Sequence, residues 1–421
     1  MNIESSYIFL SATISLSTGL AMLSRYIKGL QPTVSVFACT AILALLVKLS
    51  LNIETLGHKE LIMSYIDSIY FHDVVVNWLL SYLLFAASLH ICTKEFKKYI
   101  REIVLLAFLG TSIAIVCTAA LTYLVSNLIS PMSVLACLFF ATAISPTDPV
   151  AVLALLKNIN VSKAISAKIA GESLLNDGVG IVIFTILSEL ATYNQQPSWL
   201  TILSFFIQEV IGGLLIGFVV AKLGLYIMQP HKAQESTKMD IIGTVGMINM
   251  TQCLALLTQV SPALSAVALG LTVGHSLQGI SSKRTNELMQ FWDIIDEILN
   301  FILFFLIGLE IIRLDMSQYS IFLILGIIAI AITSIVRYLS VYIPMSVASV
   351  WQKHSPHIVN IISLGGIKGG LSLALISIMP NNVAGKDIVV FMVYCVVTFT
   401  IIVQTQLIQK YLLKIKKVLD S

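Results

Sequence analysis

Long apolar runs separated by short polar joints follow one another along almost the whole chain, and this pattern limits the fold more than any other feature. The hydrocarbon core of a bilayer is about 30 Å thick, and a helix needs about 20 apolar residues to cross it. Charged residues make up only 11% of the chain, against about 25% in soluble domains. We therefore predict an integral membrane protein that lies in the lipid bilayer.

The runs indicate an all-α polytopic membrane protein, because they are too long and too uniformly apolar for the strands of a barrel. The first run follows a segment without Lys or Arg and precedes no small-x-small cleavage site, so we interpret it as a retained helix rather than a signal peptide. About thirteen transmembrane helices are expected, at residues 6–27, 33–51, 74–92, 100–127, 133–157, 164–190, 199–229, 239–259, 262–280, 287–312, 318–350, 357–379 and 387–414.

Basic residues are distributed unequally between the joints. Taken alternately, the joints on one side carry 19 of the 25 Lys and Arg residues, among them Lys168. Because cytoplasmic joints carry the excess of Lys and Arg, an odd number of helices predicts a cytoplasmic C-terminus and an N-terminus outside. Residues 415–421 are then a short cytoplasmic tail. No basic patch suited to nucleic acid is visible, and the cysteines lack metal-binding spacing.

Two predicted helices contain helix-breaking residues around a charge. Helix five places two prolines around Thr147 and Asp148, and helix twelve places four glycines around Lys368. Each is the second from the end of a six-helix block, with helix seven, 199–229, as the connector. Paired broken helices predict a secondary transporter of two inverted six-helix repeats, with its ion site where helices five and twelve cross. The alternative is that Pro and Gly are simply common in membrane helices.

Helix six carries a polar face, within the sequence GESLLNDGVG. Ser173 and Asp177 are four residues apart and share that face, with Asn176 beside them, whereas Glu172 points about 100° away from Ser173. Asp177 and Ser173 can therefore line one cavity while Glu172 meets a different neighbour. A guanidinium without a partner is costly within a membrane span, so Glu172 is the candidate partner of Arg337 in helix eleven.

The segments ATAISPTDPVAV, GESLLNDGVGIVIF, 299–310 and GGIKGGLSLAL resemble, in order and spacing, the sodium/proton exchangers of the monovalent cation:proton antiporter 1 family, and look closest to its compact prokaryotic members. The resemblance implies a homodimer in the bacterial plasma (inner) membrane, with a role in pH homeostasis. It implies Asp177 as the essential carboxylate, beside Asp148, Thr147 and Ser173. It also implies two domains. The dimerisation domain comprises residues 1–92 and 239–312, and the ion-transport core domain comprises residues 100–190 and 318–414.

The expected mechanism is competition between two ions for one carboxylate. A partly dehydrated cavity disfavours the charged form of Asp177, so near neutral pH this residue can hold either a proton or a small cation. Oxygens of Asp177, Asp148, Ser173 and Thr147, with waters, suit Na⁺ or Li⁺. Such competition couples opposite fluxes without ATP, a redox centre or any other cofactor. Because Asn176 precedes Asp177, only one carboxylate titrates there, and electroneutral exchange is expected.

Several alternatives remain open. Asp148 either exchanges protons with the bulk or neutralises half-helix N-termini at the crossing. A K⁺/H⁺ antiporter of the same mechanism and, less favoured, a cation channel are alternative functions, and no nucleophile, metal cluster or cofactor motif favours an enzyme.

Two positions depart from the family pattern. Lys368 stands where an arginine is more usual, and Ala86 where prokaryotic relatives often have a glutamate that contacts the ion site. His90 is either a partial substitute for that glutamate or an interfacial residue. An acidic group is expected at the cytoplasmic start of helix ten, comprising Asp293, Asp296 and Glu297.

Overall fold

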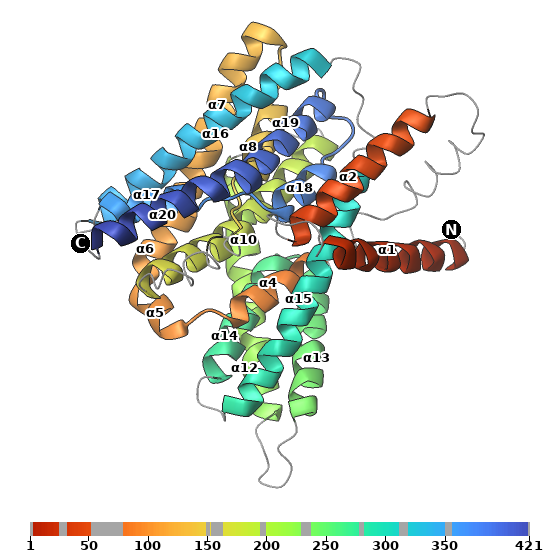
Figure 1. The fold of residues 1–421 in the computed structure, drawn as a ribbon. Helices are drawn as coiled ribbons and strands as arrows, with labels where there is room; N and C mark the ends of the chain where they lie inside the picture. The colour runs from red at the N-terminus through yellow and green to blue at the C-terminus, as the bar shows by residue number, and fades with distance from the viewer. Residues whose placement is uncertain are drawn as a thin grey trace.

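The computed structural model describes residues 3–24, 32–51, 79–148, 152, 163–193, 199–228, 237–277, 282–310, 319–349 and 356–419. Every regular element in these ranges is helical (Figure 1). The elements are α1 (Ile3–Ser24), α2 (Pro32–Leu51), α4 (Leu80–Leu89), α5 (Thr93–Lys98), α6 (Ile100–Val104), η2 (Leu105–Gly110), α7 (Thr111–Ile129), α8 (Val134–Ile144), α10 (Lys163–Tyr193), α11 (Trp199–Ile207), η3 (Gln208–Gly212), α12 (Gly213–Ile227), α13 (Thr237–Leu257), α14 (Pro262–Leu277), α15 (Ser282–Glu310), α16 (Tyr319–Ala348), α17 (Pro356–Leu364), α18 (Gly370–Ser377), α19 (Lys386–Phe399), η5 (Thr400–Gln404) and α20 (Thr405–Leu419).

Six helical spans within these ranges are long and apolar enough to cross a membrane. The all-α polytopic membrane fold predicted from the sequence is therefore confirmed, whereas the number of thirteen helices and the inverted repeat stay predictions. Three of the spans contain one π-helical segment each, at η2, η3 and η5. The spans are Ile100–Ile129, Ala164–Thr192, Leu200–Ile227, Thr237–Leu257, Ser320–Ala348 and Lys386–Ile415.

Both predicted helix interruptions are present. α8 ends at Ile144, before the first proline, because proline removes a helical donor and restricts the residue before it. The predicted continuation of that helix to residue 157 lies, apart from Val152, outside the described residues. The predicted helix 357–379 is likewise two pieces, α17 and α18, separated by residues 365–369.

The helices pack in two groups that meet at α10, α15 and α18. In one group α14 packs against α4, α12 and α13, and α15 packs against α1, α2 and α4. In the other, α16 lies between α7 and α19, and α8 contacts α7, α10, α18 and α19 (Figure 1). α14 lies close to α4 because Gly270 has no side chain, since a Cβ there would come within 2.7 Å of the Phe85 carbonyl oxygen.

Lys168 was counted with the basic residues of one side, and it lies within both the predicted helix 164–190 and the observed α10. α10 begins at Lys163, so Lys168 lies inside the helix, where it is 2% exposed. Its ammonium forms an ion pair with Glu102 of α6 and lies 4.6 Å from the ring centroid of Tyr99. The carboxylate and the aromatic face stabilise the buried cation, which removes the need for contact with water.

Candidate functional site

The two interrupted segments cross and hydrogen-bond to each other. The backbone N–H of Asp148 donates to the carbonyl oxygen of Ile367 over 2.7 Å, and the Lys368 ammonium donates to the carbonyl oxygen of Ser145 over 3.2 Å. The Lys368 backbone N–H donates to the Thr400 hydroxyl in η5. The two interruptions remove helical hydrogen bonds from these backbone groups, and the groups bond to other parts of the protein instead. Such pairing is required in the hydrocarbon region, where no water can replace it.

The glycines beside Lys368 allow this close crossing. A Cβ on Gly369 would lie 2.6 Å from Asp148 Oδ2, and a Cβ on Gly366 would lie 2.9 Å from Arg337 Cδ. Both distances are shorter than a normal van der Waals contact. The crossing therefore requires glycine where it meets Asp148 and where it meets Arg337.

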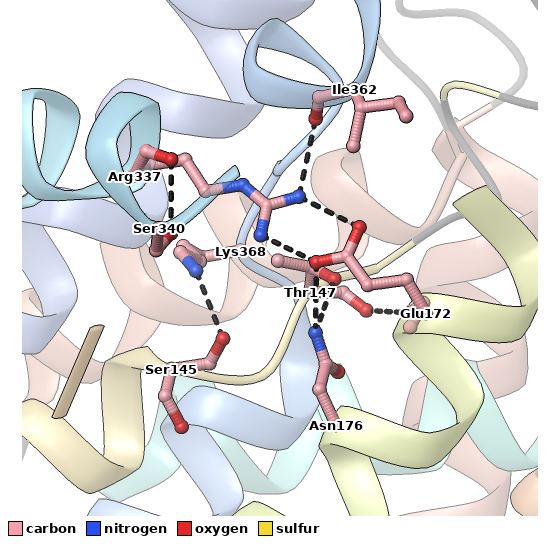
Figure 2. A network of polar contacts seen from close by, with 9 residues as sticks. Ser145, Thr147, Glu172, Asn176, Arg337, Ser340, Ile362 and Lys368 are labelled. Atoms are coloured by element: carbon pink, nitrogen blue, oxygen red, sulfur yellow. Dashed lines mark hydrogen bonds and ion pairs between the residues drawn. The ribbon is translucent and has the colours of Figure 1, made fainter. Parts of the chain in front are cut away.

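The polar face of α10 binds the first interruption. Ser173 donates its hydroxyl hydrogen to the carbonyl oxygen of Thr147. Asn176 Nδ2 donates to the Thr147 hydroxyl over 3.0 Å (Figure 2). Asn176 Nδ2 also lies 3.5 Å from Glu172 Oε1. Thr147, Ser173 and Asn176 are all buried. These contacts fix the position of Thr147, and with it the neighbouring Asp148.

The ion pair between Glu172 and Arg337 that was predicted from the sequence is present. Arg337 donates from Nη1 to Glu172 Oε1 over 2.5 Å and from Nη2 to Glu172 Oε2 over 3.0 Å (Figure 2). Nη2 also donates to the carbonyl oxygen of Ile362 over 3.1 Å. The side chains are 12% and 3% exposed, respectively, for Arg337 and Glu172. This bidentate pair joins α10, α16 and α17 beside the crossing.

A cavity of about 140 Å³ lies on the other face of the crossing. Asp148 and Asp177 line it together, as predicted, and it is large enough for a small cation with several waters. The remaining walls come from α4, α15 and the start of α18. The full lining is Leu80, Leu83, Leu84, Ala87, Pro146, Thr147, Asp148, Asp177, Asp296, Asn300, Leu303, Phe304, Gly369, Gly370, Leu371 and Ser372.

Two buried oxygens in this cavity have no hydrogen-bond partner among the described residues. They are Oδ1 of Asp177 and Oγ of Ser372. Ser372 as a whole is fully buried. Buried polar atoms nearly always have a partner, so such atoms call for an explanation such as a water or an ion. Ser372 was not predicted from the sequence as a site residue. The only feature that could have indicated it is its position two residues after the glycine cluster.

Some residues expected at the cavity lie elsewhere. Ser173 bonds to Thr147 and does not line the cavity, and Lys368 faces a second cavity of about 290 Å³ that Arg337 also lines. Ala86 is 1% exposed and does not line the 140 Å³ cavity either, whereas its neighbour Ala87 does.

His90 also lies outside the 140 Å³ cavity. Its Nε2 pairs with Asp293 Oδ1 over 3.0 Å, and both side chains are exposed. The exposed pair favours the interpretation of His90 as an interfacial residue over its interpretation as an ion ligand.

Fold and site together define a polytopic helical membrane protein in which two interrupted helices cross beside an aspartate, Asp177, whose Oδ1 is buried. The chain matches the family model for the sodium/hydrogen exchanger, transmembrane, over residues 9–414. It is 31% identical over 404 residues to the Na⁺/H⁺ antiporter NhaP of Pseudomonas aeruginosa, covering 94% of this chain and 93% of that protein. It is 30% identical to the Na⁺/H⁺ antiporter NhaH of Halobacillus aidingensis, covering 85% of this chain and 87% of that protein.

A solved structure shares the fold at low sequence identity. The sodium proton antiporter MjNhaP1 from Methanocaldococcus jannaschii at pH 8 superposes with a TM-score of 0.78 at 15% identity, covering 99% of this chain and 100% of that one. The family match and the similar relatives show that this chain belongs to the sodium/hydrogen exchanger family. It is therefore a membrane transporter of the cation/proton antiporter class, not an enzyme.

Proposed function

We propose that this protein exchanges Na⁺, and also Li⁺, for H⁺ by alternating access, with both ions competing for Asp177. The observation that carries the proposal is the buried Oδ1 of Asp177, which has no partner among the described residues and belongs to a cavity with room for a cation and waters. A carboxylate in such a place is stable either protonated or with a cation bound. The relatives named as Na⁺/H⁺ antiporters support Na⁺ as the substrate.

The proposed cation site consists of Asp177, Asp148, Thr147 and Ser173. Asp177 and Asp148 provide carboxylate oxygens, and Thr147 provides its carbonyl oxygen, which retains a second lone pair beside the bond from Ser173. Ser173 then acts by holding that carbonyl in place. No group of three or more His, Cys, Asp or Glu side chains in the described residues is placed to hold one metal ion, so waters complete the shell of a transported cation.

Exchange is proposed to be electroneutral and one-for-one. Asn176, which precedes Asp177, keeps its amide bonded to Thr147 and Glu172 and cannot carry a proton itself. Glu172 is committed to Arg337. Asp177 is then the carboxylate that takes up one proton or one Na⁺ in each half-cycle. A K⁺/H⁺ exchanger with the same mechanism remains the alternative.

An ion-transport core, 100–190 with 318–414, is proposed to move relative to a dimerisation domain, 1–92 with 239–312, and 199–229 connects the two. Support comes from the packing of α14 and α15 against α4 and of α16 between α7 and α19. The protein is proposed to work as a homodimer in the bacterial inner membrane, with its C-terminus in the cytoplasm and without a cofactor. Its proposed role is pH homeostasis.

The decisive experiment measures exchange in proteoliposomes with an internal pH dye and an imposed pH gradient. Addition of Na⁺ or Li⁺ should dissipate the gradient saturably in the wild type, and Asp177→Asn should abolish this. Glu189→Gln is the matched control, because Glu189 lies on the same helix with an exposed side chain. Wild-type exchange by Asp177→Asn would refute the proposal.

Two further arms of this experiment separate the alternatives. Substitution of K⁺ for Na⁺ tests the K⁺/H⁺ alternative. Clamping the membrane potential with valinomycin tests electroneutrality, since a one-for-one exchanger moves no net charge. Conductance without coupling to the pH gradient would indicate a channel.

A further inference from the structure

The α15 wall of the ion cavity carries polar groups that the proposed mechanism does not use. Asp296 and Asn300, one helical turn apart on α15, line the same cavity as Asp148 and Asp177. The other long wall, α4, contributes only apolar side chains, from Leu80, Leu83, Leu84 and Ala87. The cavity is thus polar on α15 and on the crossing and apolar on α4.

We propose that Asp296, with Asn300, is a cation-positioning residue that holds the hydrated cation on the α15 wall before Asp177 binds it. This proposal rests on the proposed exchange function and adds a step to it. Asp296 does not form a joint three-carboxylate site with Asp148 and Asp177, because no such group is placed to hold one ion in the described residues. Asp296 therefore acts through water and charge rather than as a third direct ligand.

The amide of Asn300 is oriented in a way that suits this role. Its Nδ2 donates to the backbone carbonyl oxygen of Asp296 over 3.0 Å. This bond holds the Asn300 side chain beside Asp296 on the wall of the cavity. An amide oxygen next to a carboxylate is a suitable neighbour for a hydrated hard cation.

An independent observation concerns Ser372, which lines the same cavity. Ser372 is fully buried, and its Oγ has no hydrogen-bond partner among the described residues. It lies in the first turn of α18, which packs directly against α15. A cation with its waters between α15 and α18 would supply partners to Ser372 as well as to Asp296.

Asp293 provides an internal comparison on the same helix. Its side chain is 61% exposed, pairs with His90 and does not line the cavity. It lies one turn before Asp296, so the two residues share a helix and a charge but differ in their access to the cavity. A charge that faces a low-dielectric cavity attracts cations more strongly than one that faces solvent.

The test compares Asp296→Asn with Asp293→Asn in full-length protein in proteoliposomes, measuring the rate against Na⁺ concentration at fixed pH. Asp296→Asn should raise the half-saturating Na⁺ concentration about three- to tenfold, because loss of a nearby charge weakens cation attraction. Its maximal rate should stay within about twofold of wild type. Asp293→Asn should change neither quantity, and Asp296→Glu should restore most of the apparent affinity.

Ionic strength separates electrostatic positioning from a structural role. Added choline chloride screens charges, so it should narrow the difference between Asp296→Asn and the wild type. An unchanged half-saturating Na⁺ concentration in Asp296→Asn refutes the inference, as does an equal effect of Asp293→Asn. If Asp296→Asn fails to elute as folded protein in detergent, the same comparison is made with Asn300→Ala. Activity in Asp177→Asn would instead refute the proposed function, so the two failures are distinguishable.

Discussion

Removing one partner of the Glu172–Arg337 pair should destabilise the protein but leave the proposed cation site in place. Glu172→Gln leaves the guanidinium of Arg337 buried without a counter-ion. Loss of one partner of a buried ion pair typically costs about 3–5 kcal/mol. The amide oxygen of Gln still accepts one of the two bonds, which have lengths of 2.5 and 3.0 Å in the wild type. We therefore expect a loss at the lower end, about 3 kcal/mol.

Thermal unfolding in detergent, followed by tryptophan fluorescence, measures this loss. A change of about 3 kcal/mol corresponds to a fall in Tm of about 3 °C for a chain of this size. The double variant Glu172→Gln with Arg337→Gln should cost clearly less than the sum of the two single variants, because it no longer buries an unpaired charge. A Tm for Glu172→Gln equal to that of the wild type, or an additive double variant, would show that this pair does not stabilise the crossing.

The same variant separates a structural role from a transport role. Glu172→Gln should retain measurable Na⁺/H⁺ exchange once its lower yield of folded protein is corrected for, whereas Asp177→Asn should retain none. Exchange is measured per folded protein, from the monodisperse fraction in detergent. Complete loss of exchange in fully folded Glu172→Gln would place Glu172 in the ion pathway instead.

Two other substitutions test the crossing and the charge balance. Gly369→Ala places a methyl group 2.6 Å from Asp148 Oδ2 and should lower the exchange rate at least about tenfold, because small displacements at a binding centre are costly. Gly246→Ala is its control, since a Cβ there meets no atom within 4 Å; equal rates in both variants would contradict the tight crossing. Asn176→Asp adds a second acid beside Asp177 and should make the exchange rate depend on a membrane potential clamped with valinomycin. If the rate stays independent of the potential, electroneutrality does not depend on having a single carboxylate at this position.

The sequence predicted the helix interruptions and the buried ion pair, because each depends on residue types that physical chemistry restricts. Prolines beside Asp148 and glycines beside Lys368 break any helix, so both interruptions could be placed to within a few residues. Arg337 within an apolar span needs an acid, and the spacing of α10 excluded the face of Asp177, which left Glu172 as the partner. These inferences depend on local chemistry and on the cost of burying charge.

The features that the sequence did not predict depend on how a helix is rotated about its axis. Charged and polar residues are spread through the first half of α15, so residue type alone does not show which of them meets a cavity. The inward position of Asp296 and the outward position of Asp293 could not be distinguished for this reason. The burial of Lys168 was not predicted either, because its tertiary contact with Glu102 is not visible in the sequence.

The hydrogen bond between the Lys368 ammonium and the Ser145 carbonyl joins residues 223 positions apart, and this separation has a consequence for biosynthesis. Translation at about 5–20 residues per second needs about 10–45 s to pass from the first interruption to the second. During that interval the Ser145 carbonyl oxygen and the Asp148 backbone N–H lack the partners they have in the folded protein, because Ile367 and Lys368 have not yet been made. The nascent chain therefore carries unpaired polar backbone groups at membrane depth until its C-terminal helices insert.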